Sequence, residues 1–85
     1  MASRGSSCLR TGVDTIHSVR KSIGSNVRAQ RKKAGLTQEA LAEMADLHPV
    51  YMSQVERGAK AVSIEALWKI SRALRISLSK LMRGI

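Results

Sequence analysis

One six-residue spacing recurs four times in this chain and constrains its fold more than any other feature. An apolar residue is followed by a capping residue, three further residues and a second apolar residue, as in "LTQEAL", "LHPVYM", "VSIEAL" and "ISLSKL". This is the spacing of a hydrophobic staple around a helix N-cap. The predicted caps are Thr37, His48, Ser63 and Ser77. Four helices are therefore expected to begin in quick succession, and no alternating pattern favours a strand.

A further helix is predicted before these four. Apolar residues recur at helical spacing at Val13, Ile16, Val19, Ile23 and Val27. Gly24 weakens a helix by about 1 kcal/mol relative to alanine. Two interpretations therefore stay open: one long helix, or a short lead-in followed by a helix from about Ser22 to Ala34. "KKAG" predicts the end of this helix, with Gly35 as a left-handed cap.

The chain is accordingly expected to be all-α, a compact five-helix bundle. Residues 22–83 form the predicted domain. Residues 1–21 form a basic, partly mobile extension, because the Gly/Ser/Arg-rich start lacks periodicity, although residues 13–21 can be helical.

The second and third predicted helices form a distinctive pair. A short turn, Asp46-Leu47-His48, leads into Pro49, which suits the first position of a helix. The third helix directs Met52 and Val55 to the core, whereas its opposite face carries Val50, Ser53, Gln54 and Arg57. Two short helices joined by such a turn, the second polar outside, are typical of a helix-turn-helix.

The charge of the chain indicates a polyanionic partner. Fifteen Lys and Arg residues oppose six Asp and Glu, for a formal net charge of +9. Such an excess favours nucleic acid first and an anionic membrane second, with a merely soluble basic protein as the remaining interpretation. The apolar helix faces are needed for the core, which argues against a membrane-surface role. With no apolar run long enough for a signal sequence or a membrane span, a cytoplasmic location is expected.

No catalytic constellation is evident. His17 and His48 have no cysteine or carboxylate at metal-ligand spacing, and Cys8 has no paired base. The prediction is a protein that is not an enzyme and uses no metal, cofactor or small-molecule ligand.

With these motifs in order, the chain from about Ile23 to Met82 resembles the Xre/Cro-CI family of helix-turn-helix transcriptional regulators, which have a lambda-repressor-like fold. The resemblance rests on "GLTQEALAEMADLHPVYMSQVERG" and "SIEALWKISRALRISLSKL". The run "DLHPVYMSQVERGAKAVSIEAL" is also similar to the controller proteins of restriction–modification systems. The family commonly has glycine where this chain has Asp46 and Arg75, so either a small local cost or a slightly altered turn is expected at each position.

The resemblance implies a set of DNA contacts. The base-reading positions of the family fall on His48, Pro49, Val50, Ser53 and Gln54. By their chemistry, Gln54 suits adenine, Arg57 or a neighbouring cation suits guanine, and Val50 suits a thymine methyl group. The family also places Gln38 on a phosphate at a helix start. The other phosphate candidates are Tyr51, Lys60, Arg28, Lys32 and Lys33. For each of these side chains the alternative is an ordinary solvated surface.

Two structural roles also follow from the resemblance. Arg31 and Glu56 are expected to form an ion pair between the first and third helices, with two independent surface charges as the alternative. The family usually dimerises through its fourth and fifth helices, so a C2 dimer is expected. Its predicted interface is Trp68, Ile76, Leu78, Leu81 and Met82, with Ile85 a possible addition, although Trp68 can equally be the edge of the core.

The predicted function is therefore a sequence-specific regulator that binds double-stranded operator DNA as a homodimer through helix 49–57. A prokaryotic or phage-encoded, nucleoid-associated protein is expected. The alternative is a protein-interaction module, antitoxin-like or coactivator-like, whose basic surface docks an acidic partner.

Overall fold

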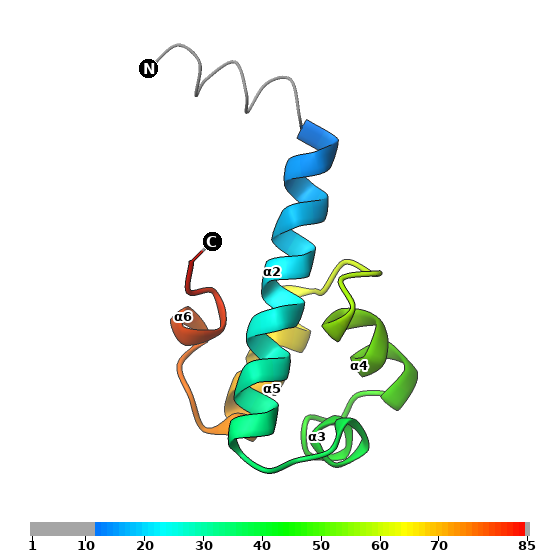
Figure 1. Cartoon of the computed structure of the whole chain (residues 1–85). Helices are drawn as coiled ribbons and strands as arrows, with labels where there is room; N and C mark the ends of the chain where they lie inside the picture. The colour runs from blue at the N-terminus through cyan, green and yellow to red at the C-terminus, as the bar shows by residue number, and fades with distance from the viewer. Residues whose placement is uncertain (1–11, 85) are drawn as a thin grey trace.

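A computed structural model describes residues 12–84, with side chains from residue 16 onward. The described part of the chain contains five α-helices and no strand, in agreement with the predicted all-α class. They are α2 (Gly12–Lys33), α3 (Gln38–Met44), α4 (Pro49–Glu56), α5 (Ile64–Leu74) and α6 (Leu78–Leu81). In Figure 1, α3 and α4 lie on one side of α2, α6 lies on the other side, and the N-terminal half of α2 extends beyond the bundle.

The four predicted helix starts are confirmed. The side chains of Thr37, Ser63 and Ser77 each accept a hydrogen bond from the backbone N–H three residues on, at 3.0, 3.0 and 3.3 Å. His48 caps α4 through its ring instead. The residues that precede the caps pack against the core: Leu36, Leu47, Val62 and Ile76. Local capping therefore sets where each of these helices begins.

The first predicted helix is one long element rather than a lead-in followed by a second helix. α2 runs unbroken from Gly12 to Lys33, so residues 13–21 are helical, and residues 1–11 lie outside the described part. Gly24 does not interrupt α2, and a Cβ atom at this position would lie 2.4 Å from the carbonyl oxygen of Val55 and 2.6 Å from that of Glu56. Glycine therefore lets the backbone of α2 approach the end of α4 closely.

The core lies where α2, α3, α4, α5 and α6 meet. Its fully buried side chains include Val27, Leu41, Met52, Val55, Ile70 and Leu81. The Asn26 amide donates to the carbonyl oxygens of Leu81 and Arg83, at 2.7 and 2.9 Å, and so ties α2 to the end of α6. The apolar residues of α2 continue beyond the part of the helix that the bundle covers, and Ile16 is therefore 55% exposed.

Two turns take the left-handed conformation without glycine. Asp46 has φ +58° and Arg75 has φ +59°, at the two positions where the family commonly has glycine. Each residue follows a helix whose last carbonyls are satisfied by the turn: the N–H groups of Leu47 and Ile76 donate to Ala42 and Ser71, at 2.8 and 3.0 Å. Asp46 and Arg75 thus adopt the left-handed conformation although neither is glycine, and the turns are not altered by the substitution.

Candidate nucleic-acid interface

The helix α4 has one buried and one exposed side. Met52 and Val55 are 0% and 1% exposed and hold α4 in the bundle. Val50 is 57% exposed, which is high for an aliphatic side chain. The other predicted base-reading residues are also accessible: His48, Pro49 and Arg57 are exposed, and Ser53 and Gln54 are half-buried. The side of α4 that the sequence predicted to face away from the core is therefore accessible to solvent in the structure.

The end of α4 is braced by the predicted ion pair between Arg31 and Glu56. The Arg31 Nε donates to Glu56 Oε2 at 2.6 Å, and Nη2 donates to Oε1 at 3.1 Å. The two side chains are only 11% and 2% exposed. A third donor, Nη1, bonds the carbonyl oxygen of Leu36 at 2.7 Å. The bidentate geometry fixes α4 against α2 and the start of α3.

Gln38 belongs to the same network, which the sequence did not indicate. Its amide nitrogen donates to Glu56 Oε1 at 3.0 Å. This bond leaves one amide proton of the side chain for another acceptor. Gln38 also lines an open hollow between the starts of α3 and α4, together with Thr37, Pro49, Val50 and Ser53. Gln38, the residue predicted to contact a phosphate, thus bonds the buried Glu56 carboxylate and also lines the open hollow.

Two other phosphate candidates lie together at the loop that follows α4. The Tyr51 hydroxyl accepts a hydrogen bond from the Ser63 N–H at 3.3 Å, so its own proton remains available for donation. The Lys60 Nζ lies 5.9 Å from the centroid of the Tyr51 ring, in a cation–π arrangement. No sequence pattern indicated that Ser63, the cap of α5, also positions Tyr51.

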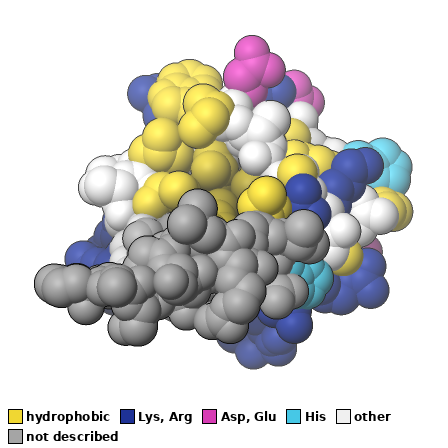
Figure 2. All heavy atoms as spheres, turned by 90° about the horizontal axis from the view of Figure 1, so that it is seen from above, with side chains coloured by type: hydrophobic (Ala, Val, Ile, Leu, Met, Phe, Trp, Pro, Cys, Tyr) yellow, Lys and Arg dark blue, Asp and Glu magenta, His cyan; other side chains and the backbone are white. Residues whose placement is uncertain are grey.

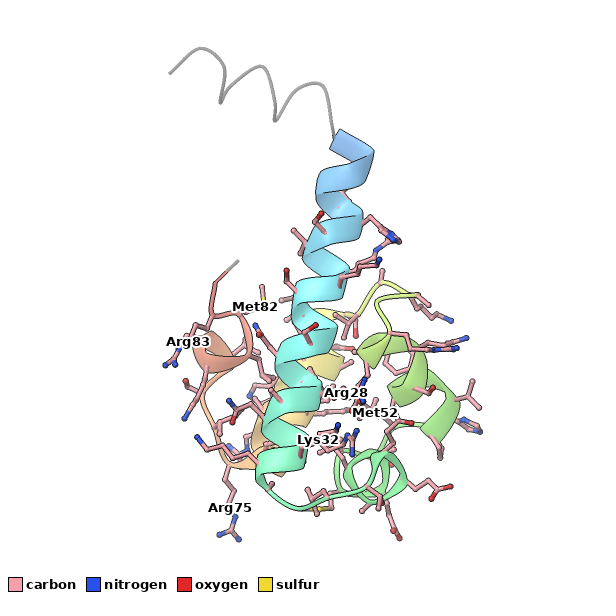
Figure 3. All side chains as sticks on the ribbon, in the orientation of Figure 1. Arg28, Lys32, Met52, Arg75, Met82 and Arg83 are labelled. Carbon is pink, nitrogen blue, oxygen red and sulfur yellow. The ribbon has the colours of Figure 1, made fainter. Side chains whose placement is uncertain are left out.

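The remaining cationic candidates lie on α2. Arg28 and Lys32 are exposed and project from α2 on the side of the view that contains α3 and α4 (Figure 3). Helical periodicity agrees with this placement. Gly24 and Arg31 of α2 both contact α4; Arg28 lies one turn after Gly24, and Lys32 directly follows Arg31. Lys33 is exposed at the end of the same helix. No hydrogen bond or ion pair joins Arg28, Lys32 or Lys33 to the predicted base-reading side chains in the described part of the chain.

Of the predicted dimer residues that the structure describes, all but Leu81 keep some exposed area. Trp68 is 53% exposed, and Ile76, Leu78 and Met82 are half-buried. Leu81 was assigned wrongly: it is 0% exposed, because the staple around Ser77 turns it into the core against α2. Ile85 lies outside the described residues.

Ile64 is an exposed apolar residue that sequence reasoning missed. It is 68% exposed and lines a hollow with Trp68 and Leu78. Its position four residues before Trp68, off the inward stripe of α5, was the available signal. The Arg72 guanidinium lies over the indole ring of Trp68, 5.2 Å from its centroid. Figure 2 shows hydrophobic side chains gathered over one part of the face seen from above.

Among the described residues, no helix is long and apolar enough to cross a membrane. The same part of the chain holds no group of three or more His, Cys, Asp or Glu side chains that could bind a metal ion.

Residues 27–81 match the model of the helix-turn-helix family HTH_3, which is Xre-like, across α3, α4 and α5. The chain belongs to this family. Membership confirms the predicted fold and the predicted class, a DNA-binding transcriptional regulator.

Similar proteins of this family include two control proteins. The regulator is 39% identical to the control protein C.BamHI of Bacillus amyloliquefaciens over 67 residues, which cover 78% of this chain and 83% of that protein. It is 36% identical to C.SmaI of Serratia marcescens over 64 residues, which cover 75% and 76% of the two chains.

Two solved structures show the same architecture. The restriction-modification controller protein C.AhdI of Aeromonas hydrophila superposes with a TM-score of 0.72 and 35% identity, covering 73% of the regulator and 94% of that chain. The clp gene regulator ClgR of Corynebacterium glutamicum superposes with a TM-score of 0.72 and 36% identity, covering 75% and 83%.

Proposed function

We propose that the protein binds an operator in double-stranded DNA as a homodimer, with α4 of each subunit in the major groove. The observation that carries this proposal is the exposed side of α4, held by the buried Arg31–Glu56–Gln38 network and flanked by cations. Such a helix presents a rigid set of side chains to base edges, while the surrounding cations contact phosphates.

Selection of bound sequences from a random DNA pool tests the operator. The expected result is a two-fold symmetric site whose half-sites lie about one helical turn apart. Binding that depends on neither DNA sequence nor salt concentration would contradict this function. It would favour the alternative of an interaction module for an acidic protein.

Base reading and phosphate contact are separable by two substitutions. Gln54→Ala should weaken operator binding by about 1–3 kcal/mol and leave binding to random DNA nearly unchanged. Lys60→Ala should weaken both equally and lower the salt slope by about 1. Arg83→Ala is the matched control, since Arg83 is exposed at α6, on the other side of α2 from α4 (Figure 3), and should change neither quantity. Equal losses on operator and random DNA for Gln54→Ala would refute its role in base reading.

The homodimer is proposed to form through the apolar side of α5 and α6. Ile64, Trp68 and Leu78 line one hollow there, and Ile76 and Met82 add half-buried apolar area nearby in the chain. Exposed apolar groups of this size are typical of a protein contact, and tryptophan is a frequent anchor in interfaces. A C2 dimer built on this side would leave α4 free for DNA.

The regulated genes are proposed to be those of a restriction–modification system, in the cytoplasm of a bacterium or of a phage-infected cell. Support comes from the control proteins, which are matched across most of their own length. Mapping the selected operator onto the source genome tests this role. An operator upstream of a restriction endonuclease or methyltransferase gene is the expected result, and operators confined to other genes would contradict it.

A further inference from the structure

The cap of α4 differs in chemistry from the other three helix caps. Those three use hydroxyl groups, which can both donate and accept hydrogen bonds. His48 instead accepts through its ring Nδ1, from the N–H of Val50 at 3.1 Å. Pro49 between them has no N–H, so Val50 carries the first free backbone donor of the helix. The imidazole is thus attached to the start of the helix that faces DNA.

This attachment selects one tautomer of the imidazole. A backbone N–H can only donate, so Nδ1 must carry a lone pair, and the single proton of the neutral ring must lie on Nε2. The ring therefore has a fixed polarity: acceptor toward the helix and donor on its other nitrogen. A serine or threonine cap differs, because its single hydroxyl can still either donate to or accept from a partner while it caps the helix.

The donor nitrogen is available to a partner. His48 is exposed, and within residues 16–84 the structure records no hydrogen bond from Nε2. Asp46 and Glu65 line the hollow beside His48, together with Tyr51, Ser63 and Lys69, yet neither carboxylate accepts from the ring. Its neighbours in α4, Pro49 and Val50, offer no polar side chain. His48 is therefore an exposed polar group at the start of α4, next to Pro49 and Val50.

We propose that His48 determines specificity by donating from Nε2–H to guanine in each operator half-site; this rests on the proposed operator-binding function. In the major groove guanine presents two acceptors, O6 and N7, and no donor. Cytosine presents only a donor there, adenine places its N6 donor beside N7, and thymine offers a single acceptor, O4, next to its methyl group. A histidine whose tautomer is held by the cap cannot become an acceptor for either donor without losing the bond to Val50.

Cap-preserving substitutions provide the test, because aspartate and asparagine are both good N-caps. His48→Asp converts the outward donor into an acceptor, and the selected pool should change from guanine to cytosine at one position of each half-site, by about five- to tenfold. His48→Asn offers both a donor and an acceptor and should raise adenine at the same position. Circular dichroism should show unchanged folding in both variants.

The outcomes separate this proposal from the proposed function. If the unmodified protein selects an operator and both variants select the same bases, the guanine contact is refuted while operator binding stands. Equal weakening on all sequences would assign His48 to a phosphate and would also refute it. If the unmodified protein selects no sequence, both proposals fall.

The tautomer can be tested without DNA. A scalar coupling across the hydrogen bond between the Val50 amide nitrogen and His48 Nδ1, with the ring proton on Nε2, is the expected result of nitrogen-15 NMR. A proton on Nδ1 in the folded protein would overturn the proposal, whatever the binding data show.

Discussion

At the scale of single residues, the most consequential side chain is a buried carboxylate. Glu56 accepts from both Arg31 and Gln38 and so connects α4 to α2 and α3. Removing one member of such a pair costs much more than the pair contributes, because the remaining charge stays buried without its partner.

Glu56→Ala should therefore lower the free energy of unfolding by about 3–5 kcal/mol, measured by urea denaturation. The double variant Arg31→Ala/Glu56→Ala should lose less than the sum of the two single losses, since it leaves no unpaired charge. Strictly additive losses would show that the two side chains do not interact. Gln38→Ala, which removes one hydrogen bond to the same carboxylate, should cost only about 1 kcal/mol.

Arg75 illustrates a cost of backbone conformation. An L-residue in the left-handed region is strained, whereas glycine is not, although glycine loses more entropy on folding. Arg75→Gly should therefore stabilise the protein by about 0.5–1 kcal/mol, measured as a shift in urea midpoint. Asp46→Gly should stabilise the protein less than Arg75→Gly, because aspartate adopts the left-handed conformation more readily than arginine.

The opposite substitution, from glycine to alanine at a left-handed position, tests whether backbone strain is the cause. Gly35 has φ +74° and no atom within 4 Å of an added Cβ, so Gly35→Ala tests backbone strain alone. It should destabilise the protein by about 1 kcal/mol. Stabilisation by this change would contradict the explanation given for Arg75.

At the scale of elements, close approach of two helices matters more than helix propensity. α4 has only eight residues, too few for a stable isolated helix, so packing must hold it. The contact of α2 with its end depends on Gly24, whose missing side chain leaves room for two carbonyl oxygens.

Gly24→Ala should therefore destabilise the protein by about 1–3 kcal/mol, even though alanine favours the helix by about 1 kcal/mol. Ser25→Ala is the control, because Ser25 is exposed on the same helix and should gain a small amount of stability. Thermal or urea unfolding measures both changes. A more stable Gly24→Ala protein would show that α2 and α4 can separate at no cost.

At the scale of the whole molecule, the two proposed functional surfaces are distinct. The proposed base-reading side belongs to α4, and the apolar hollow of the proposed dimer belongs to α5 and α6. Trp68 is the only tryptophan in the chain, so its fluorescence reports on the proposed dimer directly.

Ile64→Glu should weaken dimerisation by at least about 2 kcal/mol, because it places a charge in an apolar contact. Analytical ultracentrifugation and the dilution dependence of Trp68 emission measure this effect. Ile16→Glu is the control: Ile16 is similarly exposed but lies on the extended part of α2. Unchanged association of Ile64→Glu would place the dimer interface elsewhere.

Features that arise within a few residues could be predicted from the sequence. The four caps, the left-handed Gly35 and the exposed side of α4 depend on local hydrogen bonds and helical periodicity, and the structure confirms them. The left-handed turns at Asp46 and Arg75 were expected from the family resemblance. The Arg31–Glu56 pair needed the family resemblance as well, because the two residues are distant in the chain.

Which surfaces meet depends on the packing of helices that are distant in the chain. In the sequence Gly24 is only a weak point of a helix, but in the structure it lets α4 pack closely against α2. Likewise, only the structure shows that the Gln38 amide donates a hydrogen bond to Glu56. Leu81 lies in the core, contrary to the predicted interface, and Ile64, which was not among the predicted residues, is exposed. Helical periodicity groups residues by face, but the crossing of helices distant in sequence determines which face is covered.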